Sequence, residues 1–220
     1  MNNNKVDYFL EKNLVDYLKS VEFMERKVNE IYKGNCNEFL WLLEHDNIYT
    51  AGTSAKSKDL LKPNKFKVHK TNRGGQFTYH GPGQKVAYLL INIRDAGYDI
   101  RGFINLLEDW IINSLKEIGI KAAADKDHVG IWVKKDNCKK KIASIGLRVR
   151  KGITFHGISI NINPNLENFN GINPCGNDHK NVTSIEENIK ILNAENFNNI
   201  LLKNFEIIFK KKLNPIKTLI

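Results

Sequence analysis

The sequence predicts a single α+β domain. Predicted strands and helices are mixed along the chain without a regular strand–helix–strand alternation, and neither an internal repeat nor a linker-like stretch divides them. A length of 220 residues is typical of one domain, and hydrophobic residues make up 41% of the chain, which is enough for a buried core. The chain is therefore expected to fold as one unit around a shared core.

The first third of the chain predicts one helix and two short strands. Apolar residues recur every three or four positions between Leu14 and Ile31, which favours an amphipathic helix. The apolar run at 39–43 is too short for a typical helix and predicts a buried strand, which leads into a loop at 44–52. Val68 begins a second short strand at the end of a lysine-rich stretch.

The middle of the chain predicts a buried strand, a second helix and an antiparallel meander. Residues 86–93 are almost all apolar, as in a strand buried on both faces. Apolar spacing of three and four over 104–118 predicts the helix. Strand-like segments at 130–133, 145–149 and 158–162 follow, and the last two alternate apolar and polar residues across a short turn. This pattern is typical of neighbouring antiparallel strands.

A long loop and a final helix complete the chain. The loop runs from Pro164 to Val182, and loops of this length in compact domains are often functional. The final helix is expected at about 195–210.

Charge and cysteine content limit the function classes. The chain has 34 basic and 24 acidic residues, and its net charge of +10 favours anionic partners without choosing among nucleic acid, membrane and acidic protein. No apolar run approaches the roughly 20 residues that span a bilayer, and no signal-like segment opens the chain, so a cytoplasmic protein is expected. Cys36, Cys138 and Cys175 form no CxxC pair, so neither a disulfide framework nor a metal site is expected.

A glycine-rich segment is the first candidate site. Residues 73–84 read Arg-Gly-Gly-Gln-Phe-Thr-Tyr-His-Gly-Pro-Gly-Gln. Glycine lets backbone approach a ligand closely, Arg73 and His80 supply hydrogen-bond donors, and His80 can also exchange protons. A polar, glycine-rich loop before a buried strand is typical of a binding site, and a plain turn is the alternative.

Cys175 is the candidate nucleophile. It lies in Asn-Pro-Cys-Gly, between a proline that restricts the backbone and a glycine that leaves it flexible. A thiol in such a loop is expected to be accessible. The thiolate is the reactive form, and a neighbouring cation favours it. Lys141, His80 and His156 are candidates for that neighbour, and sequence spacing alone leaves the choice open.

Five motifs together resemble one family, the lipoyl(octanoyl) transferases. They are Arg73–Gln84, Lys141–Gly146, Thr154–Gly157 with Asn161–Pro164, Pro174–Gly176 and Thr183–Ser184. The resemblance covers roughly residues 39–190, with the motifs in order and compatibly spaced. Asp46 and Asn47 stand where prolines are common in the family, which affects the rigidity of that loop and not the chemistry.

The resemblance implies a fold and a chemistry. The fold is a mixed β-sheet with flanking helices, as in the catalytic domains of biotin and lipoate protein ligases, with residues 1–220 forming one octanoyltransferase domain. Cys175 and Lys141 are implied to form a catalytic dyad. The residues implied to line the acyl and thioester site are Arg73, Gly74, Gly75, Gln76, Phe77, Thr78, Tyr79, His80, Ser144, Ile145, Gly146, Gly157, Ile158 and Ser159.

The implied enzyme is an acyltransferase with two protein substrates. Octanoyl-acyl carrier protein is the implied donor. The implied acceptors are lysines on the lipoyl domains of 2-oxoacid dehydrogenase complexes and on the glycine cleavage H protein. No cofactor or metal is expected to take part, and neither a nucleic acid nor a membrane is an expected partner. Both protein partners are typically acidic, so Arg148, Arg150, Lys151 and Lys134 are candidates for a docking face, with simple solubility as the alternative.

Two other functions stay open at the level of sequence. An ATP-dependent lipoate or biotin ligase on the same fold uses a lysine and needs no nucleophilic cysteine, so Cys175 argues against it. A basic nucleic-acid-binding module would use the lysine-rich runs at 134–141 and 210–212, but these runs carry no recognisable binding motif.

Overall fold

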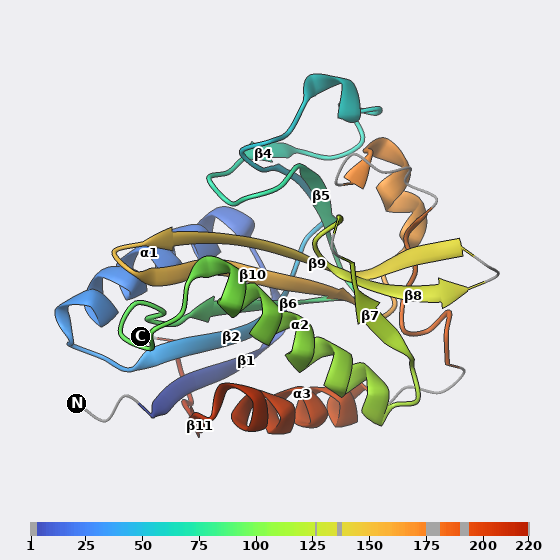
Figure 1. Cartoon of the computed structure of the whole chain (residues 1–220). Coiled ribbons are helices and arrows are strands. Elements are labelled where there is room, and N and C mark those ends of the chain that lie inside the picture. Colours follow the sequence, from blue (N-terminus) through green and yellow to red (C-terminus); the bar gives the residue numbers. More distant parts are fainter. Residues whose placement is uncertain (1–3, 126, 136–137, 175–180, 190–193, 220) are drawn as a thin grey trace.

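The structure, a computed structural model, describes residues 4–125, 127–135, 138–174, 181–189 and 194–219. Within these ranges eight strands form one mixed sheet in the order β11-β1-β2-β6-β10-β9-β8-β7 (Figure 1). β1 runs parallel to both β11 and β2, and the other neighbours are antiparallel. The strands are β1 (Lys5–Val15), β2 (Glu38–His45), β6 (Gln84–Leu90), β7 (Ala122–Ala124), β8 (Ile131–Lys135), β9 (Cys138–Arg150), β10 (Ile153–Asn161) and β11 (Lys212–Pro215).

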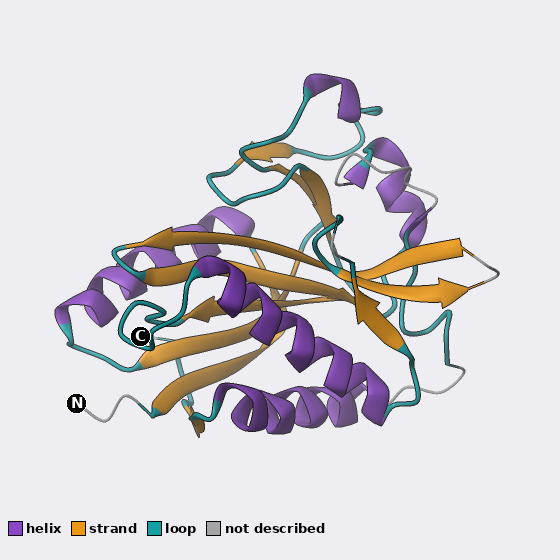
Figure 2. Ribbon diagram, viewed as in Figure 1, coloured by secondary structure: helices purple, strands orange, loops and turns teal. Residues whose placement is uncertain are grey.

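Helices cover both faces of this sheet (Figures 1 and 2). α2 (Ile100–Glu117) and α3 (Ala194–Phe209) lie side by side on one face, where Trp110 and Phe205 pack edge to face in the larger apolar core. α1 (Tyr17–Lys33) lies on the other face and buries Met24 and Val28 against β2, β6 and β10. The predicted α+β class, with a mixed sheet and flanking helices, is confirmed.

A small second sheet stands beside the main one. It has the order β4-β3-β5, from β3 (Ile48–Ala51), β4 (Val68–Lys70) and β5 (Phe77–His80). The short 3-10 helices η1 (Ser57–Asp59) and η2 (Leu166–Gly171) lie in the segments around it, and aromatic residues from β3, β5 and η2 form a separate apolar cluster. This sheet holds the glycine-rich segment 73–84 against β9 and β10 of the main sheet.

The predicted antiparallel meander is confirmed in β8, β9 and β10. β9 and β10 are joined at Lys151 and Gly152, whose φ angles of 56° and 82° are both in the left-handed region. Two consecutive residues with positive φ suit the twist of a two-residue hairpin. The expected strand at Val68 and the helices at 104–118 and 195–210 are also found, with bounds a few residues different.

Three expectations near the chain ends and in the early loop are wrong. The first helix does not begin at Leu14, because that residue belongs to β1 and Asp16 caps the helix by accepting a hydrogen bond from Lys19 N. The segment 44–52 is not all loop, since β3 pairs with β4 and β5 there. β11 was not expected at all, and it forms because its backbone pairs with β1 from the opposite end of the chain.

Candidate functional site

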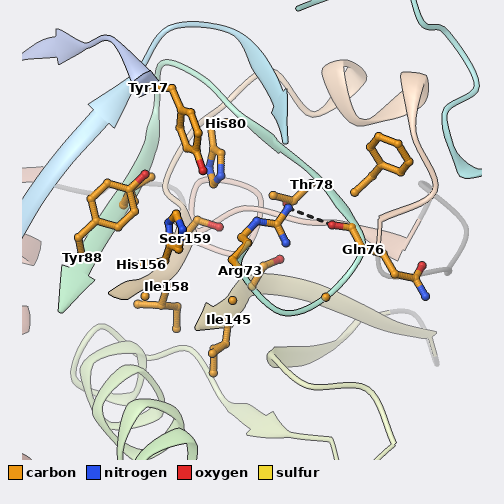
Figure 3. A pocket seen from close by; sticks show the side chains of 16 residues that line it. Tyr17, Arg73, Gln76, Thr78, His80, Tyr88, Ile145, His156, Ile158 and Ser159 are labelled. Carbon is orange, nitrogen blue, oxygen red and sulfur yellow. Dashed lines mark hydrogen bonds between the residues drawn. The ribbon is translucent and has the colours of Figure 1, made fainter. Parts of the chain in front are cut away.

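A pocket opens between the glycine-rich segment and the middle of β9 and β10, on the α1 face of the main sheet (Figure 3). The pocket is lined by residues of the glycine-rich segment, β6, β9, β10 and the first residue of α1. All the residues predicted to line an acyl and thioester site line this pocket, except Gly74 and Tyr79. The structure therefore brings three separate sequence segments together, and their role in binding stays a prediction.

Gly74 and Tyr79, the two exceptions, contact residues around the pocket instead of lining it. Gly74 donates its backbone N–H to Leu147 O at 2.9 Å, which ties the glycine-rich segment to β9. Tyr79 points away, donates its hydroxyl hydrogen to Asn47 Oδ1 at 2.6 Å and packs on Phe169 in the small apolar cluster. Asn47, where the family commonly has proline, therefore has a hydrogen-bonding partner within this fold.

Arg73 organises the glycine-rich segment from inside. Its buried guanidinium donates to Thr50 O and Gln76 O, both at 2.9 Å, and to Gly74 O at 3.0 Å. These bonds curl the segment around the side chain, and the contact with Gln76 is drawn in Figure 3. Gly75 has a φ of 90°, which a side chain would strain. Arg73 thus acts as a structural centre as well as a positive charge beside the pocket.

Gly157 allows two strands to approach closely under the pocket. A Cβ atom at this position would collide with the carbonyl oxygen of Ala87 on β6. Its register partner on β9 is Gly146, where a Cβ would meet Arg73 Cδ at 3.1 Å. The floor of the pocket is therefore built of backbone, because side chains at these two positions would fill the space that Arg73 and β6 occupy.

Tyr17, Tyr88 and His156 also line the pocket, although none of them belongs to the set of residues predicted to line it. Tyr17 from the start of α1 stacks on His80 at 6.1 Å between ring centroids, and Tyr88 from β6 lies 5.9 Å from His156. His45 connects them, since its Nδ1 donates to Val15 O and its Nε2 accepts from the Tyr88 hydroxyl, both at 2.7 Å. Val86 is the remaining lining residue outside the predicted set.

These rings are uncharged near neutral pH. Burial lowers the pKa of His45 to about 4 and that of His156 to about 3, the latter helped by the charge of Arg73. Burial also lowers the pKa of His80 well below 6.5 and raises the pKa of Tyr17 to about 12. The desolvation of the charged form is the main cause in every case. His80 and His156 are consequently poor candidates for the cation beside a thiolate.

His156 has an unusual backbone for a strand residue. Its φ of 67° is rare for a residue other than glycine and is a form of local strain. Strict alternation would direct it to the same side as Ile158 and Ile160, yet its ring packs against Phe155 and Tyr88 of the α1-face core. Among the described residues, its buried Nδ1 has no hydrogen-bond partner.

Lys141 reaches the pocket face through a β-bulge. Ile131 of β8 pairs with Ala143, but Trp132 pairs with Lys141, so Ile142 is an extra residue on β9. In a strand that alternated regularly through Ile142, Lys141 would share the core face with Ala143 and Ile145. The bulge instead gives it the face of Trp132.

Lys141 is held firmly there. Its side chain is 4% exposed, and Nζ donates to Val129 O at 3.1 Å and lies 4.7 Å from the centre of the Trp132 ring. Its backbone oxygen accepts a hydrogen bond from Thr183 N at 3.0 Å, and Lys141 forms a parallel bridge with Val182.

Cys175 lies outside the described residues, but both flanks of its segment are described. Before it, Asn173 N donates to Asp59 O at 2.8 Å. After it, Val182 and Thr183 lie along Lys141 on β9. The other two cysteines are elsewhere: Cys36 is half-buried and burial raises its thiol pKa, while Cys138 is exposed at the start of β9.

The described part of the chain contains no group of three or more histidine, cysteine or acidic side chains placed to hold a metal ion. None of its helices combines the length and the apolar character needed to cross a membrane.

Comparison with known proteins shows the family of the chain. Residues 16–206 match the model of the lipoyl protein ligase A/B catalytic domain. An octanoyltransferase of Bartonella quintana is 47% identical over 191 residues, covering 83% of this chain and 78% of that protein. An octanoyltransferase of Ehrlichia chaffeensis is 40% identical over 217 residues and covers 98% of both chains.

Solved structures agree on the fold. A bi-partite lipoate protein ligase from Thermoplasma acidophilum superposes with a TM-score of 0.72 at 14% identity, covering 98% of this chain and 88% of that one. A biotin protein ligase from Aquifex aeolicus gives 0.52 at 13% identity, covering 93% and 69%. The predicted relationship to both ligase folds is thereby confirmed. By the family model that it matches and by its similarity to these relatives, the chain belongs to the lipoyl protein ligase A/B family and, within it, to the octanoyltransferases, which are acyltransferases.

Proposed function

We propose that this protein transfers an octanoyl group from octanoyl-acyl carrier protein to a lysine of lipoyl domains, through a thioester on Cys175. The observation that carries the proposal is the position of Lys141. A bulge directs this buried lysine to the pocket face, and its strand is hydrogen-bonded to the residues that follow Cys175. Relatives at 40–47% identity named octanoyltransferases support the acyl group.

The chemistry proceeds in two balanced steps. The Cys175 thiolate attacks the thioester carbonyl of the donor, and the C–S bond to the carrier breaks, so that the carrier leaves as a thiol after taking up a proton. The amine of the acceptor lysine then attacks the new thioester, Cys175 leaves as a thiolate and an amide forms, while the proton that the amine loses replaces the one taken up by the carrier thiol. Thioester exchange is nearly isoenergetic and amide formation is downhill, so the reaction needs no ATP and no metal. A covalent intermediate lets two protein substrates use one site in turn.

The residues of this chain have distinct roles in that scheme. The Lys141 ammonium favours the thiolate form of Cys175 and exchanges protons with it. Backbone N–H groups around the pocket stabilise the tetrahedral oxyanion.

The partners and the location follow from the same scheme. Acceptors are the lipoyl domains of 2-oxoacid dehydrogenase complexes and the glycine cleavage H protein, and both steps take place in the cytoplasm. The net charge of +10 favours encounter with acidic donors and acceptors. Residues 1–220 form a single octanoyltransferase catalytic domain.

Intact-protein mass spectrometry after incubation with octanoyl-acyl carrier protein, without ATP, tests the proposal. The wild type is expected to gain one octanoyl group, and Cys175→Ala none. Cys36→Ala and Cys138→Ala are matched controls, because they remove thiols outside the site and should still be acylated. An adduct that persists in Cys175→Ala, or acyl transfer that requires ATP, would overturn the thioester scheme, and the second outcome would favour a ligase.

A further inference from the structure

A series of hydrogen bonds between buried side chains connects the pocket to the segment that pairs with Lys141. His80 Nδ1 on β5 lies 2.7 Å from Gln84 Oε1 on β6, and Gln84 Nε2 lies 2.9 Å from Asn161 Oδ1 on β10. Asn161 Nδ2 lies 2.9 Å from the backbone oxygen of Thr183. All four residues are buried, with Gln84 only 1% exposed. Such a chain has to satisfy every donor and acceptor in it.

The donor and the acceptor of every hydrogen bond in this series follow from its last member, the backbone oxygen of Thr183. A backbone carbonyl only accepts hydrogen bonds, so Asn161 presents its NH₂ group to Thr183 and its Oδ1 to Gln84. Gln84 therefore donates with Nε2 and accepts with Oε1, which leaves His80 Nδ1 as the donor.

The ring of His80 then has one possible tautomer. Burial lowers the pKa of His80 well below 6.5, so the ring is neutral near pH 7 and carries a single N–H group. Because that hydrogen is on Nδ1, Nε2 keeps an unprotonated lone pair. His80 lines the pocket whereas Gln84 does not, so Nε2 is the nitrogen available to a ligand.

We propose that Gln84 and Asn161 are positioning residues that hold His80 as the Nδ1–H tautomer, so that His80 Nε2 accepts a hydrogen bond from an N–H group of the substrate. The tautomer does not depend on the identity of the substrate. The assignment of the donor rests on the proposed function, in which the attacking lysine amine supplies such an N–H group.

At its other end, this series of hydrogen bonds stabilises the segment that follows Cys175. Thr183, whose oxygen ends the chain, donates its own N–H to Lys141 O, and Ile185 N donates to Asn161 O at 2.8 Å. Asn161 therefore joins the imidazole in the pocket to the same short segment that lies along Lys141. A substitution of Asn161 is therefore expected to affect both the His80 ring and the segment at Thr183 and Ile185.

The test is the tautomer of His80 in the full-length protein, read by long-range proton–nitrogen correlation NMR on isotopically labelled histidine. The wild type is expected to show a protonated Nδ1 and an unprotonated Nε2 at His80. His45 is an internal control, because its Nδ1 is fixed by Val15 O and not by Gln84. Gln84→Met removes the acceptor and should change the tautomer of His80 while leaving His45 unchanged. Gln84→Glu keeps an acceptor and should retain it.

Asn161→Asp separates the two ends of the chain. A carboxylate still accepts from Gln84 Nε2, so the tautomer of His80 should persist, but it no longer donates to Thr183 O. Hydrogen exchange at the Thr183 and Ile185 amides should become faster. A wild-type His80 with a protonated Nε2, or a tautomer that survives Gln84→Met, would overturn the proposal. These readouts need no activity, so they are independent of whether the proposed function is right.

Discussion

The Lys141 ammonium lies over the face of Trp132, its register partner on the neighbouring strand, with Nζ 4.7 Å from the ring centre. The indole N–H of Trp132 in turn donates to His128 O at 2.9 Å, which fixes the ring. A cation over an indole is stabilised by the ring's electrostatic potential, by about 0.5–2 kcal/mol. Trp132 therefore helps to fix the position of the Lys141 side chain.

Replacing Trp132 by leucine should slow acylation of the enzyme. The loss of about 0.5–2 kcal/mol corresponds to a roughly 2- to 30-fold lower rate if the whole effect is felt in that step. Trp132→Phe keeps an aromatic face and should retain most of the rate. Single-turnover acylation measured by mass spectrometry distinguishes the two, and equal rates for leucine and phenylalanine would show that the ring face is unimportant.

Lys141→Met should make acylation depend on more alkaline conditions. A cation near a thiol favours the thiolate by about 1–3 pKa units, so its removal lowers the thiolate population near neutral pH by roughly tenfold or more. The pH–rate profile of acylation is the measurement, and Lys140→Met is the control because it removes a neighbouring charge one residue away. An unchanged profile would show that Lys141 does not set the thiolate population of Cys175.

Acid should destabilise the fold through its buried histidines. In the folded protein the pKa is about 4 for His45 and about 3 for His156, compared with 6.5 for an exposed histidine. The unfolded chain therefore binds more protons than the folded protein as the pH falls below 6.5. Stability is therefore complete above pH 6.5 and decreases towards pH 4, by about 2 kcal/mol per histidine at pH 5.

Urea unfolding at pH 7 and pH 5 measures this loss. His156→Asn tolerates a positive φ and removes one titrating ring, so its loss between the two pH values should be smaller than that of the wild type. An equal loss in both proteins would mean that His156 does not contribute.

Charge reversal at Arg148 and Arg150 should weaken productive encounter with acyl carrier protein. Arg148 stacks over Phe155 on the pocket face and Arg150 reaches Glu25 of α1, so both lie on the side where the pocket opens. The fall in kcat/KM should be larger at low salt than at high salt. Lys116→Glu with Lys121→Glu makes the same charge change on and after α2, and should have less effect. A loss that does not vary with salt would remove the steering argument.

Gly157→Ala should destabilise the protein by about 3 kcal/mol or more, since its Cβ meets the carbonyl oxygen of Ala87 on a central strand. Gly97→Ala is the matched control, because its Cβ would meet nothing within 4 Å and only its φ of 75° is strained, at about 1 kcal/mol. Thermal unfolding of the two variants compares a collision with a purely conformational cost.

The sequence predicts the site best where its residues are contiguous. The residues 73–80, 144–146 and 157–159 could be identified because each group lies in one short motif, and the pocket contains nearly all of them. Tyr17 and Tyr88 could not be found in this way. Tyr17 is an ordinary residue at the start of an amphipathic helix, and Tyr88 is part of an apolar strand, so only the packing of α1 on the sheet brings them to His80 and His45.

The missed strands have a related cause. β1 (Lys5–Val15) has no clean alternation of apolar and polar residues, and its helix-like apolar spacing continues into α1. β11 (Lys212–Pro215) pairs with β1 from the far end of the chain. Local patterns carry no information about such a long-range pairing, and short strands at the edge of a sheet depend on it most.

The bulge at Ile142 divides β9 into two parts that are out of phase with each other. Downstream of it, odd-numbered residues face the α2–α3 core, whereas upstream the odd-numbered Lys141 lies on the opposite face of the sheet, with Trp132. The count of residues between Lys141 and Ser144 therefore matters as much as their chemical kinds. If β9 alternated regularly from Ala143 back through Ile142, the Lys141 ammonium would point towards the hydrocarbon interior.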